Sequence, residues 1–285
     1  MTSSKRAFIG IDGGGSKTRA LAIDSEGRNL STNTTTGCNP HNVGFQNAAD
    51  RIDRVVASTC QSLRGEKFEV VSVFCGIAGI RTSDEKAKLA KPLSRFPWAR
   101  NASVFIDSDL TIAYEAALGD RSGLCLIAGT GAACIAKDAS GTFHTSSNRQ
   151  PDGSEPGSGY GIGKAAIESG LLQEIKGGTR DAVSRQAEHV IELANRGDPK
   201  AREILVKNAQ ALAELAARVH VQANLGTAFP IALAGGLATA NSVFRSLTSQ
   251  YVSDLFPESE LLPPHLTPVE AAARLALRQR SSQNP

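Results

Sequence analysis

Residues 9–24 read IGIDGGGSKTRALAID, and this stretch decides how the chain begins to fold. It nearly matches the nucleotide-binding pattern G-x-x-x-x-G-K-[ST], because Gly10 and Gly15 have the required spacing. However, Ser16 stands where the pattern needs lysine, and Lys17 comes one place late. That pattern also needs a helix directly after the lysine, because the amide groups of the helix hold the phosphates. Here the next residues, TRALAID, have the alternating apolar pattern of a strand and run into a turn. The glycines therefore join one strand to another.

Length and composition define the broad class of protein. A chain of 285 residues is long enough for two domains, and 41% apolar with 21% charged residues is typical of a globular protein. A net charge of +3 is too small to indicate nucleic acid as a partner. No apolar run has the length of a signal peptide or of a membrane span, and the five cysteines show no paired spacing. We expect a cytoplasmic protein with free thiols and no membrane partner.

An internal repeat organises the chain. Residues 125–141, CLIAGTGAACIAKDASG, repeat the outline of residues 8–27, FIGIDGGGSKTRALAIDSEG. Each copy has an apolar strand, a glycine-rich turn, a second strand and a closing Asp-x-x-Gly turn. Strands and helices alternate after each copy, which predicts two α/β halves, each opened by a glycine-turn hairpin.

The pattern of apolar residues places the individual elements. In the first half, the expected strands are 7–12, 18–24 and 29–35, followed by an apolar strand near 70–79 and another at 102–107. In the second half and beyond, the expected helices are about 159–175, 181–196, 199–224, 242–256 and 269–280.

Both glycine turns have the chemistry of a phosphate site. Amide groups in such a turn are open to a phosphate, because no Cβ blocks its approach. The hydroxyls of Ser16, Thr18 and Thr130 add donors beside the two turns. If the halves face each other across a cleft, the turns hold opposite sides of one polyphosphate.

Asp12 is the candidate metal ligand. It stands at the end of the first predicted strand, where a carboxylate can hold Mg²⁺ or the water shell of the ion. Aspartate before glycine is also a favoured turn pair, so turn chemistry alone is the alternative. The phosphate-binding pattern around Asp12 favours the metal role.

Five segments of the chain occur in a characteristic order. They are GIDGGGSKTRA (10–20), TGCNPHNVG (36–44), LIAGTGA (126–132), EPGSGYGIGKAAI (155–167) and ALAGGLA (232–238). In this order they resemble the actin, sugar-kinase and Hsp70 superfamily. More narrowly, the chain resembles the N-acetylglucosamine kinase branch, which is grouped with the BadF/BadG/BcrA/BcrD ATPases. The resemblance extends from about residue 7 to about residue 276.

The resemblance implies a fold and a set of cofactors. The fold would be α/β, with two ribonuclease H-like (actin-like ATPase) domains and a central cleft. The domains would be residues 1–118 and 119–267, with the final helix, about 268–285, packing back on the first. The cofactors would be ATP and Mg²⁺, and a homodimer is a possible assembly.

The same resemblance implies roles for individual residues. Asn39 would hydrogen-bond the sugar hydroxyls, and Glu155 would hold the sugar ring. The nucleotide-binding residues would be Gly13, Gly14, Gly15, Ser16, Lys17, Thr18, Thr130, Gly131, Gly235 and Gly236, of which the last two would line the adenosine.

The general base would be the aspartate before the helix that leads to the second glycine turn. Two candidates, Asp107 and Asp109, occur in FIDSDLTIAYEAALGDRSG. Asp109 fits the spacing of the family segment to Gly119 and Gly129, so it is the predicted base and a contact of the sugar, with Asp107 as the alternative. Ser108 or Asp109 can instead serve only as a helix N-cap.

The chain departs from the family on the sugar side. The family tryptophan is missing before EPGSG, and Glu155, followed by Pro156, stands where the family has aspartate. Ala132 and Ala133 replace polar residues of the second turn. These differences leave the identity of the sugar open, and Glu155 can alternatively cap the helix that starts near Ser158.

The predicted activity is ATP-dependent phosphorylation of an amino sugar, N-acetylglucosamine or glucosamine, at the 6-hydroxyl. Alternatives with the same fold are a kinase of N-acetylmuramic acid or of a plain hexose. A non-catalytic sugar sensor is a third reading. The fourth is an ATPase that activates a 2-hydroxyacyl-CoA dehydratase, which needs cysteines that hold an iron–sulfur cluster; Cys125 and Cys134 flank the second turn but fall inside predicted strands.

Overall fold

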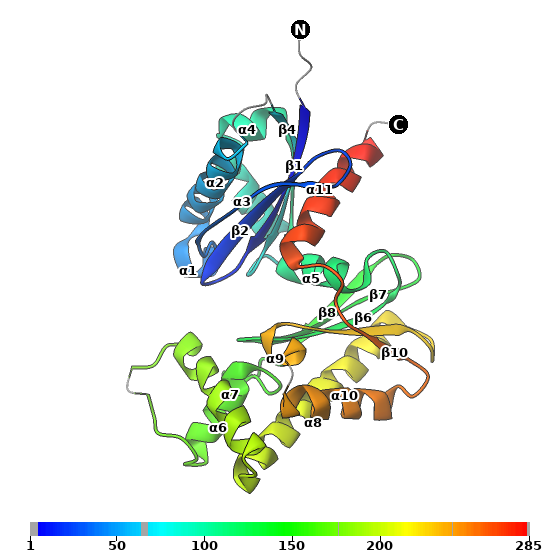
Figure 1. The fold of residues 1–285 in the computed structure, drawn as a ribbon. Coiled ribbons are helices and arrows are strands. Elements are labelled where there is room, and N and C mark those ends of the chain that lie inside the picture. The colour runs from blue at the N-terminus through cyan, green and yellow to red at the C-terminus, as the bar shows by residue number, and fades with distance from the viewer. Residues whose placement is uncertain (1–4, 64–67, 176, 241, 284–285) are drawn as a thin grey trace. The chain divides into compact units, whose positions relative to one another are not determined.

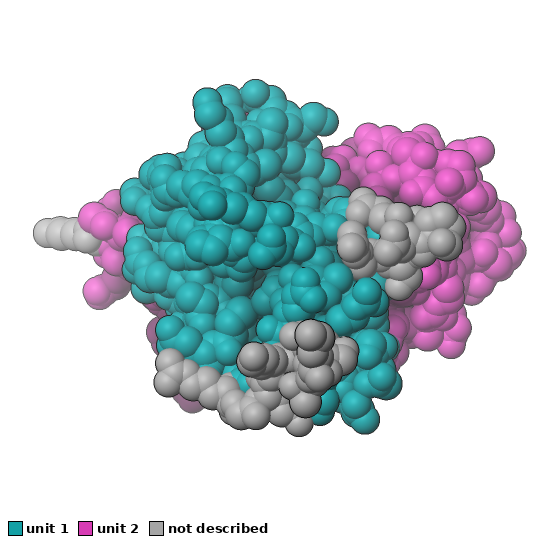
Figure 2. Space-filling model, turned by 90° about the horizontal axis from the view of Figure 1, so that it is seen from above, with its two compact units in different colours: residues 1–116, 266–285 teal, residues 117–265 magenta. Residues whose placement is uncertain are grey.

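The computed structural model describes residues 5–63, 68–175, 177–240 and 242–283. The chain forms two compact units, one made of residues 1–116 and 266–285 and the other of residues 117–265 (Figures 1 and 2). Each unit contains a five-stranded sheet that mixes parallel and antiparallel pairs. The prediction of an α/β fold with a repeated hairpin is therefore confirmed.

The sheet of unit 1 has the order β3-β2-β1-β4-β5. The glycine-turn hairpin joins β1 to β2 in antiparallel pairing, with Gly13 opposite Thr18, whereas β4 and β5 run parallel to β1. Its strands are β1 (Lys5–Gly13), β2 (Lys17–Ile23), β3 (Asn29–Thr36), β4 (Phe68–Ile77) and β5 (Ser103–Ser108).

Helices pack on both faces of this sheet, because alternate side chains of β1 are apolar on either side. Ile9 and Ile11 pack in a buried cluster with α2 and α3, and Phe8 packs in a second cluster with α11. Figure 1 shows α2 and α11 on opposite sides of the strands. The helices of unit 1 are α1 (Pro40–Val43), α2 (Phe45–Gln61), α3 (Ser83–Leu93), α4 (Pro97–Asn101), α5 (Asp109–Leu118), whose last two residues belong to unit 2, and α11 (Pro268–Gln283).

Gly10 of β1 lies against the backbone of α11. A Cβ built on Gly10 would lie 2.0 Å from the backbone nitrogen of Ala273 and 2.5 Å from the carbonyl carbon of Ala272. The backbone of the last helix can therefore lie directly on β1 only because residue 10 has no side chain.

Unit 2 repeats the arrangement with the order β10-β9-β6-β7-β8. The second hairpin joins β6 to β7, and β9 and β10 continue the sheet in parallel pairing. The strands are β6 (Gly123–Ala128), β7 (Ala132–Lys137), β8 (Phe143–Ser147), β9 (Pro230–Ala234) and β10 (Glu260–Leu262). The helices are α6 (Gly159–Glu168), α7 (Arg180–Asn195), α8 (Pro199–Ala223), α9 (Gly236–Thr239) and α10 (Val243–Leu255).

The predicted Asp-x-x-Gly turns follow both hairpins, one between β2 and β3 and the other between β7 and β8. Gly27 and Gly141 have φ angles of 79° and 87°, and their amides donate to the carbonyls of Asp24 and Asp138. These angles lie in the left-handed region that favours glycine. The sequence repeat is thus a repeat of backbone conformation.

Several short elements differ from the sequence prediction. The strands β8 and β10 were not predicted, because FHTSS is a polar edge strand and β10 has only three residues. The helix α6 ends at Glu168 and not near Ile175, since Gly170, at a φ of 71°, donates to the carbonyl of Ile167 and closes the helix end. Within the part of the chain that the structure describes, no helix is long and apolar enough to span a bilayer.

Candidate active site

Three parallel strands of unit 1 bring the predicted catalytic residues to one edge of the sheet. β1, β4 and β5 run in the same direction, with Asp12 opposite Gly76 and Gly76 opposite Asp107. The carboxyl ends of these strands therefore lie at a shared edge, the usual place for a ligand in an α/β sheet. Asp12, the loop after β4 and Asp109 all lie there.

The first glycine turn is held by the segment that follows β3. The Gly14 carbonyl accepts hydrogen bonds from the amides of Cys38, at 3.0 Å, and Asn39, at 3.2 Å, and Ser16 O accepts from Gly37 N at 3.0 Å. In a trans peptide the carbonyl and the following N–H point in opposite directions. The amides of Gly15 and Lys17 therefore point away from this segment, as a phosphate-binding turn requires.

The negative charge of Asp109 acts on the buried carboxylate of Asp12. Burial is the main cause that raises the pKa of both groups, and the negative charge of Asp109 raises the pKa of Asp12 further. Within the described residues, the Asp12 carboxylate accepts no hydrogen bond. A carboxylate without a protein donor keeps its oxygens for a ligand, and such oxygens suit Mg²⁺ or its water shell.

The structure gives Asp107 and Asp109 different surroundings. Asp107 forms an ion pair of 2.7 Å with Lys86 of α3, and its Oδ1 accepts from the Ser108 amide at 2.8 Å. Asp109 is half-buried at the start of α5 and lies 3.1 Å from the Ser108 hydroxyl, which also accepts from the Leu110 amide. Asp107 is thus already neutralised by a cation.

Asn39, the predicted sugar contact, caps the one-turn helix α1. Its Oδ1 accepts from the amide of His41 at 2.9 Å, so the amide group of its side chain remains as a donor for a ligand. His41 Nε2 lies 2.8 Å from Gly79 O and 3.1 Å from Glu85 Oε1. These contacts join the Asn39 loop to the loop after β4.

The second glycine turn is held by the start of α6. Gly129 O and Thr130 O accept from the amides of Gly159, at 2.8 Å, and Tyr160, at 3.2 Å. By the same peptide geometry, the amides of Thr130 and Gly131 point away from α6. These two residues were predicted to contact phosphate, and their orientation suits that role.

The predicted adenosine motif lies beside this turn in unit 2. β9 is parallel to β6, with Ala234 opposite Ile127, so Gly235 and Gly129 follow neighbouring strand ends. A Cβ on Gly235 would lie 2.4 Å from the Ala128 carbonyl oxygen, whereas a Cβ on Gly236 would meet open space. Gly235 is therefore required for packing, and Gly236 is open on its outer side.

Glu155 is buried, and both of its carboxylate oxygens have donors in the protein. Oε1 accepts from the Ala132 amide at 2.8 Å, and Oε2 pairs with Arg180 of α7. The cap of α6 is Ser158, whose hydroxyl accepts from the Gly161 amide at 2.9 Å. The alternative that the Glu155 side chain caps this helix is therefore wrong.

The remaining predicted nucleotide contacts differ in exposure. Thr130 and Ser16 are exposed, as is Lys17 at the start of β2. Thr18 is fully buried, and its hydroxyl donates to Thr36 O at 2.9 Å. That hydroxyl links β2 to β3 through this hydrogen bond, so the structure argues against a direct contact of Thr18 with phosphate.

Two residues of the site were not found from the sequence. Arg180 reaches Glu155 from 25 positions along the chain, and Lys86 reaches Asp107 from α3. Neither pair has a spacing that would mark it within one helix or strand. Their partners become visible only when the helices pack.

The cysteines beside the second turn do not suit an iron–sulfur cluster. Cys125 and Cys134 are fully buried inside β6 and β7. Burial raises the pKa of Cys125 to about 12 and the pKa of Cys134 well above the usual range. Cluster ligands are thiolates, so neutral buried thiols argue against this alternative.

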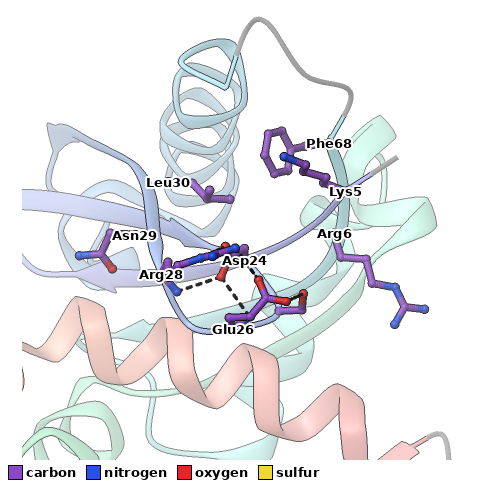
Figure 3. A pocket seen from close by; sticks show the side chains of 9 residues that line it. Lys5, Arg6, Asp24, Glu26, Arg28, Asn29, Leu30 and Phe68 are labelled. Carbon is purple, nitrogen blue, oxygen red and sulfur yellow. Dashed lines mark hydrogen bonds and ion pairs between the residues drawn. The ribbon is translucent and has the colours of Figure 1, made fainter. Parts of the chain in front are cut away.

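A hollow at the opposite end of β1 is separate from the candidate site (Figure 3). It is lined by Lys5 and Arg6, where β1 begins, and by the turn that contains Asp24. Asp24 accepts from Arg28 Nε at 2.7 Å and from the amides of Glu26 and Arg28 at 3.0 and 2.9 Å. These contacts hold the β2–β3 turn and involve none of the predicted site residues.

The fold and these motifs define a class of nucleotide-using proteins. A family model for the BadF/BadG/BcrA/BcrD ATPases matches residues 9–276. The chain belongs to this ATPase family.

Relatives and solved structures agree with this assignment. The N-acetyl-D-glucosamine kinase of Dictyostelium discoideum is 26% identical over 318 aligned positions, covering 97% of this chain and 99% of that protein. The N-acetylmuramic acid/N-acetylglucosamine kinase of Clostridium acetobutylicum is 26% identical over 173 positions, 60% of this chain and 56% of that protein.

The likeness to solved structures concerns the fold. A Chromobacterium violaceum protein provisionally named an N-acetylglucosamine kinase has a TM-score of 0.72 at 19% identity, covering 96% of this chain and 100% of that one. A ROK family glucokinase of Streptomyces griseus, solved with glucose and AMPPNP, has a TM-score of 0.60 at 22% identity, covering 96% of this chain and 99% of that one. Both units thus have the fold of actin-like ATPases and ROK sugar kinases.

Proposed function

We propose that this protein is a sugar kinase that transfers the γ-phosphoryl group of ATP to the 6-hydroxyl of an amino sugar, N-acetylglucosamine or glucosamine. The observation that carries the proposal is the position of Asp109. It lies at the carboxyl edge of the unit 1 sheet, with its charge close enough to raise the pKa of Asp12. Membership of an ATPase family supports ATP as the phosphoryl donor, and the named relatives are kinases of amino sugars.

Asp109 is the proposed general base. Phosphoryl transfer to a hydroxyl needs a carboxylate that accepts the proton of the attacking oxygen. Burial raises the pKa of Asp109, which makes the carboxylate a stronger base than an exposed aspartate. Asp107 is the weaker candidate, because Lys86 already neutralises its charge.

The two glycine turns are the proposed phosphate ligands. In unit 1 the amide of Gly15 points away from the protein segment that holds its turn, and in unit 2 the amides of Thr130 and Gly131 do the same. Gly235 and Gly236 are the proposed contacts of the adenosine. Asp12 would hold Mg²⁺, which neutralises charge on the phosphates when it is bound.

The sugar side rests on fewer contacts. Asn39 keeps a side-chain amide donor for a hydroxyl, whereas both oxygens of Glu155 are already in use. Ala132 and Ala133 offer no polar side chain to an acetamido group. A site without such partners discriminates weakly against a substrate that lacks the group. We therefore expect glucosamine to compete with N-acetylglucosamine.

A coupled assay of ADP release tests this function. The purified chain is given Mg-ATP with N-acetylglucosamine, glucosamine, N-acetylmuramic acid or glucose, and ¹H and ³¹P NMR then locate the phosphate on the product. We expect sugar-dependent ADP release, an amino sugar as the substrate with the highest kcat/KM, and a 6-phosphate. Equal ADP release with and without every sugar would refute the sugar kinase, and a preference for glucose would refute the amino sugar.

A further inference from the structure

The contacts of Glu155 point to a role in the nucleotide half of the site. Its side chain is only 8% exposed, and its Oε1 accepts the Ala132 amide at the end of the second glycine turn. A Cβ on Gly131 would lie 2.9 Å from the same oxygen. The carboxylate therefore lies directly against the turn, and a side chain at residue 131 would push it from this position.

Arg180 holds this carboxylate from the opposite side. It lies at the first position of α7, pairs with Glu155 Oε2, and places its guanidinium 4.4 Å from the centre of the Tyr160 ring. Tyr160 belongs to α6, and its amide donates to Thr130 O at 3.2 Å. Arg180 thus contacts both Glu155 and Tyr160, and each of these residues forms a hydrogen bond with the glycine turn.

The start of α7 is itself fixed against α6. A Cβ on Gly159 would lie 2.5 Å from the Ser184 hydroxyl, and a Cβ on Gly163 would lie 2.0 Å from Val183 O. Thr179 caps α7 directly before Arg180. The close packing of α6 and α7 therefore also fixes the backbone position of Arg180. The turn, α6 and α7 therefore form one connected unit.

We propose that Glu155 and Arg180 are positioning residues that hold the second glycine turn in the conformation that presents the Thr130 and Gly131 amides to ATP phosphates. This inference rests on the proposed function. It assigns Glu155 to nucleotide binding and not to the sugar, although its position in the sequence predicts a sugar contact.

The physical reason is the cost of a buried charge. Without Arg180, the Glu155 carboxylate is left buried with no cation, and it relaxes by leaving the Ala132 amide for water. The turn then loses its fixed end, and its amides must be ordered again when phosphate binds. Losing a hydrogen bond to a charged group corresponds to about a tenfold loss of affinity.

The test measures nucleotide and sugar binding separately in the full chain. Arg180→Met is compared with Arg185→Met, a matched change at an exposed arginine of the same helix. Calorimetry with Mg-ADP alone gives the nucleotide Kd, and steady-state kinetics give KM for ATP and for the sugar. We expect the Kd of Mg-ADP and the KM of ATP to rise about tenfold in Arg180→Met only, with the sugar KM changed by less than about twofold.

Two further variants test whether the residues act as a pair. Glu155→Gln keeps a neutral acceptor for Ala132 but loses the ion pair that fixes it, so it is expected to weaken Mg-ADP binding in the same direction as Arg180→Met. The double variant is expected to be no weaker than the worse single variant. If Arg180→Met does not fold, Arg180→Lys keeps the charge and loses only the planar fork, with a smaller effect in the same direction.

The outcomes separate this inference from the proposed function. A rise in the sugar KM of Glu155→Gln with unchanged Mg-ADP affinity would overturn the positioning role and restore the sugar contact. Additive losses in the double variant would also overturn it. Because Mg-ADP binding is measured without sugar, it reports on Arg180 even if no sugar is phosphorylated.

Discussion

Replacing Gly10 by alanine should destabilise unit 1 through the contact between β1 and α11. The added Cβ would lie 2.0 Å from the Ala273 nitrogen, 2.5 Å from the Ala272 carbonyl carbon and 2.6 Å from the Ala273 Cα. Ordinary Cβ contacts begin at 3.4 Å, so the helix backbone must retreat by 1.4 Å, the difference between 3.4 and 2.0 Å. No side chain can rotate away to relieve the overlap, because all three atoms are backbone.

The size of the effect follows from what α11 buries. The helix contributes the apolar side chains of Val269, Ala272, Ala273, Leu275 and Ala276 to its cluster with β1 and β4. Overpacking a core costs typically 1–3 kcal/mol, and a backbone overlap belongs at the upper end, about 3 kcal/mol. For a unit of this size, that free energy lowers the melting temperature by roughly 10 °C.

Thermal unfolding followed by circular dichroism, with urea unfolding as a second measure, checks this value. Gly226→Ala is the control, since a Cβ there meets no atom within 4 Å. A melting temperature of Gly10→Ala within about 1 °C of the wild type would refute the claim that α11 needs a glycine beneath it.

Asp109→Asn should lower kcat by about 10²–10⁴-fold in the ADP-release assay while Mg-ADP still binds, whereas Asp107→Asn should have far less effect; the reverse order would mean that Asp107 is the base. Because its pKa is raised, Asp109 binds more protons in the native state than in the unfolded state, so its ionisation lowers the free energy of unfolding as pH rises. Asp109→Asn should therefore unfold at a higher urea concentration than the wild type at pH 7. A lower urea midpoint would contradict this sign. The acidic limb of kcat/KM against pH should lie above the range of an ordinary aspartate, since activity is lost as pH falls through the raised pKa. Asp12→Asn should weaken Mn²⁺ binding measured by electron paramagnetic resonance in the presence of ADP, and unchanged binding would remove Asp12 from the metal site. Deleting the residues after Pro268 should abolish cooperative unfolding of unit 1, which an unchanged unfolding curve would disprove.

The local elements of this protein could be predicted because they depend on neighbouring residues. Alternating apolar side chains after residues 13–16 indicate a strand and exclude a helix, and β2 is that strand. The repeat of a glycine turn and an Asp-x-x-Gly turn predicts two similar halves, and Gly27 and Gly141 share the same backbone conformation. The polar strand β8 escaped prediction because an edge strand needs no apolar face.

The candidate site was predictable only as far as its chemistry lies in short segments. The sequence by itself determines that Asp12 ends a strand, that Asp109 starts a helix and that glycines stand in both turns. Which aspartate is neutralised was decided by α3, because Lys86 reaches Asp107 only when that helix packs beside β5. The difference between the two carboxylates is therefore a property of packing.

The tertiary structure alone decided what Gly10 and Glu155 contact. From the sequence, Gly10 belongs to a phosphate motif and Glu155 to a sugar motif. In the folded chain Gly10 lies against the backbone of the last helix, and Glu155 lies between Ala132 and Arg180. Periodicity along a strand or helix reports which side chains share a face, but it carries no information on which distant backbone or charge will lie opposite them, because that depends on how whole helices pack on the sheet.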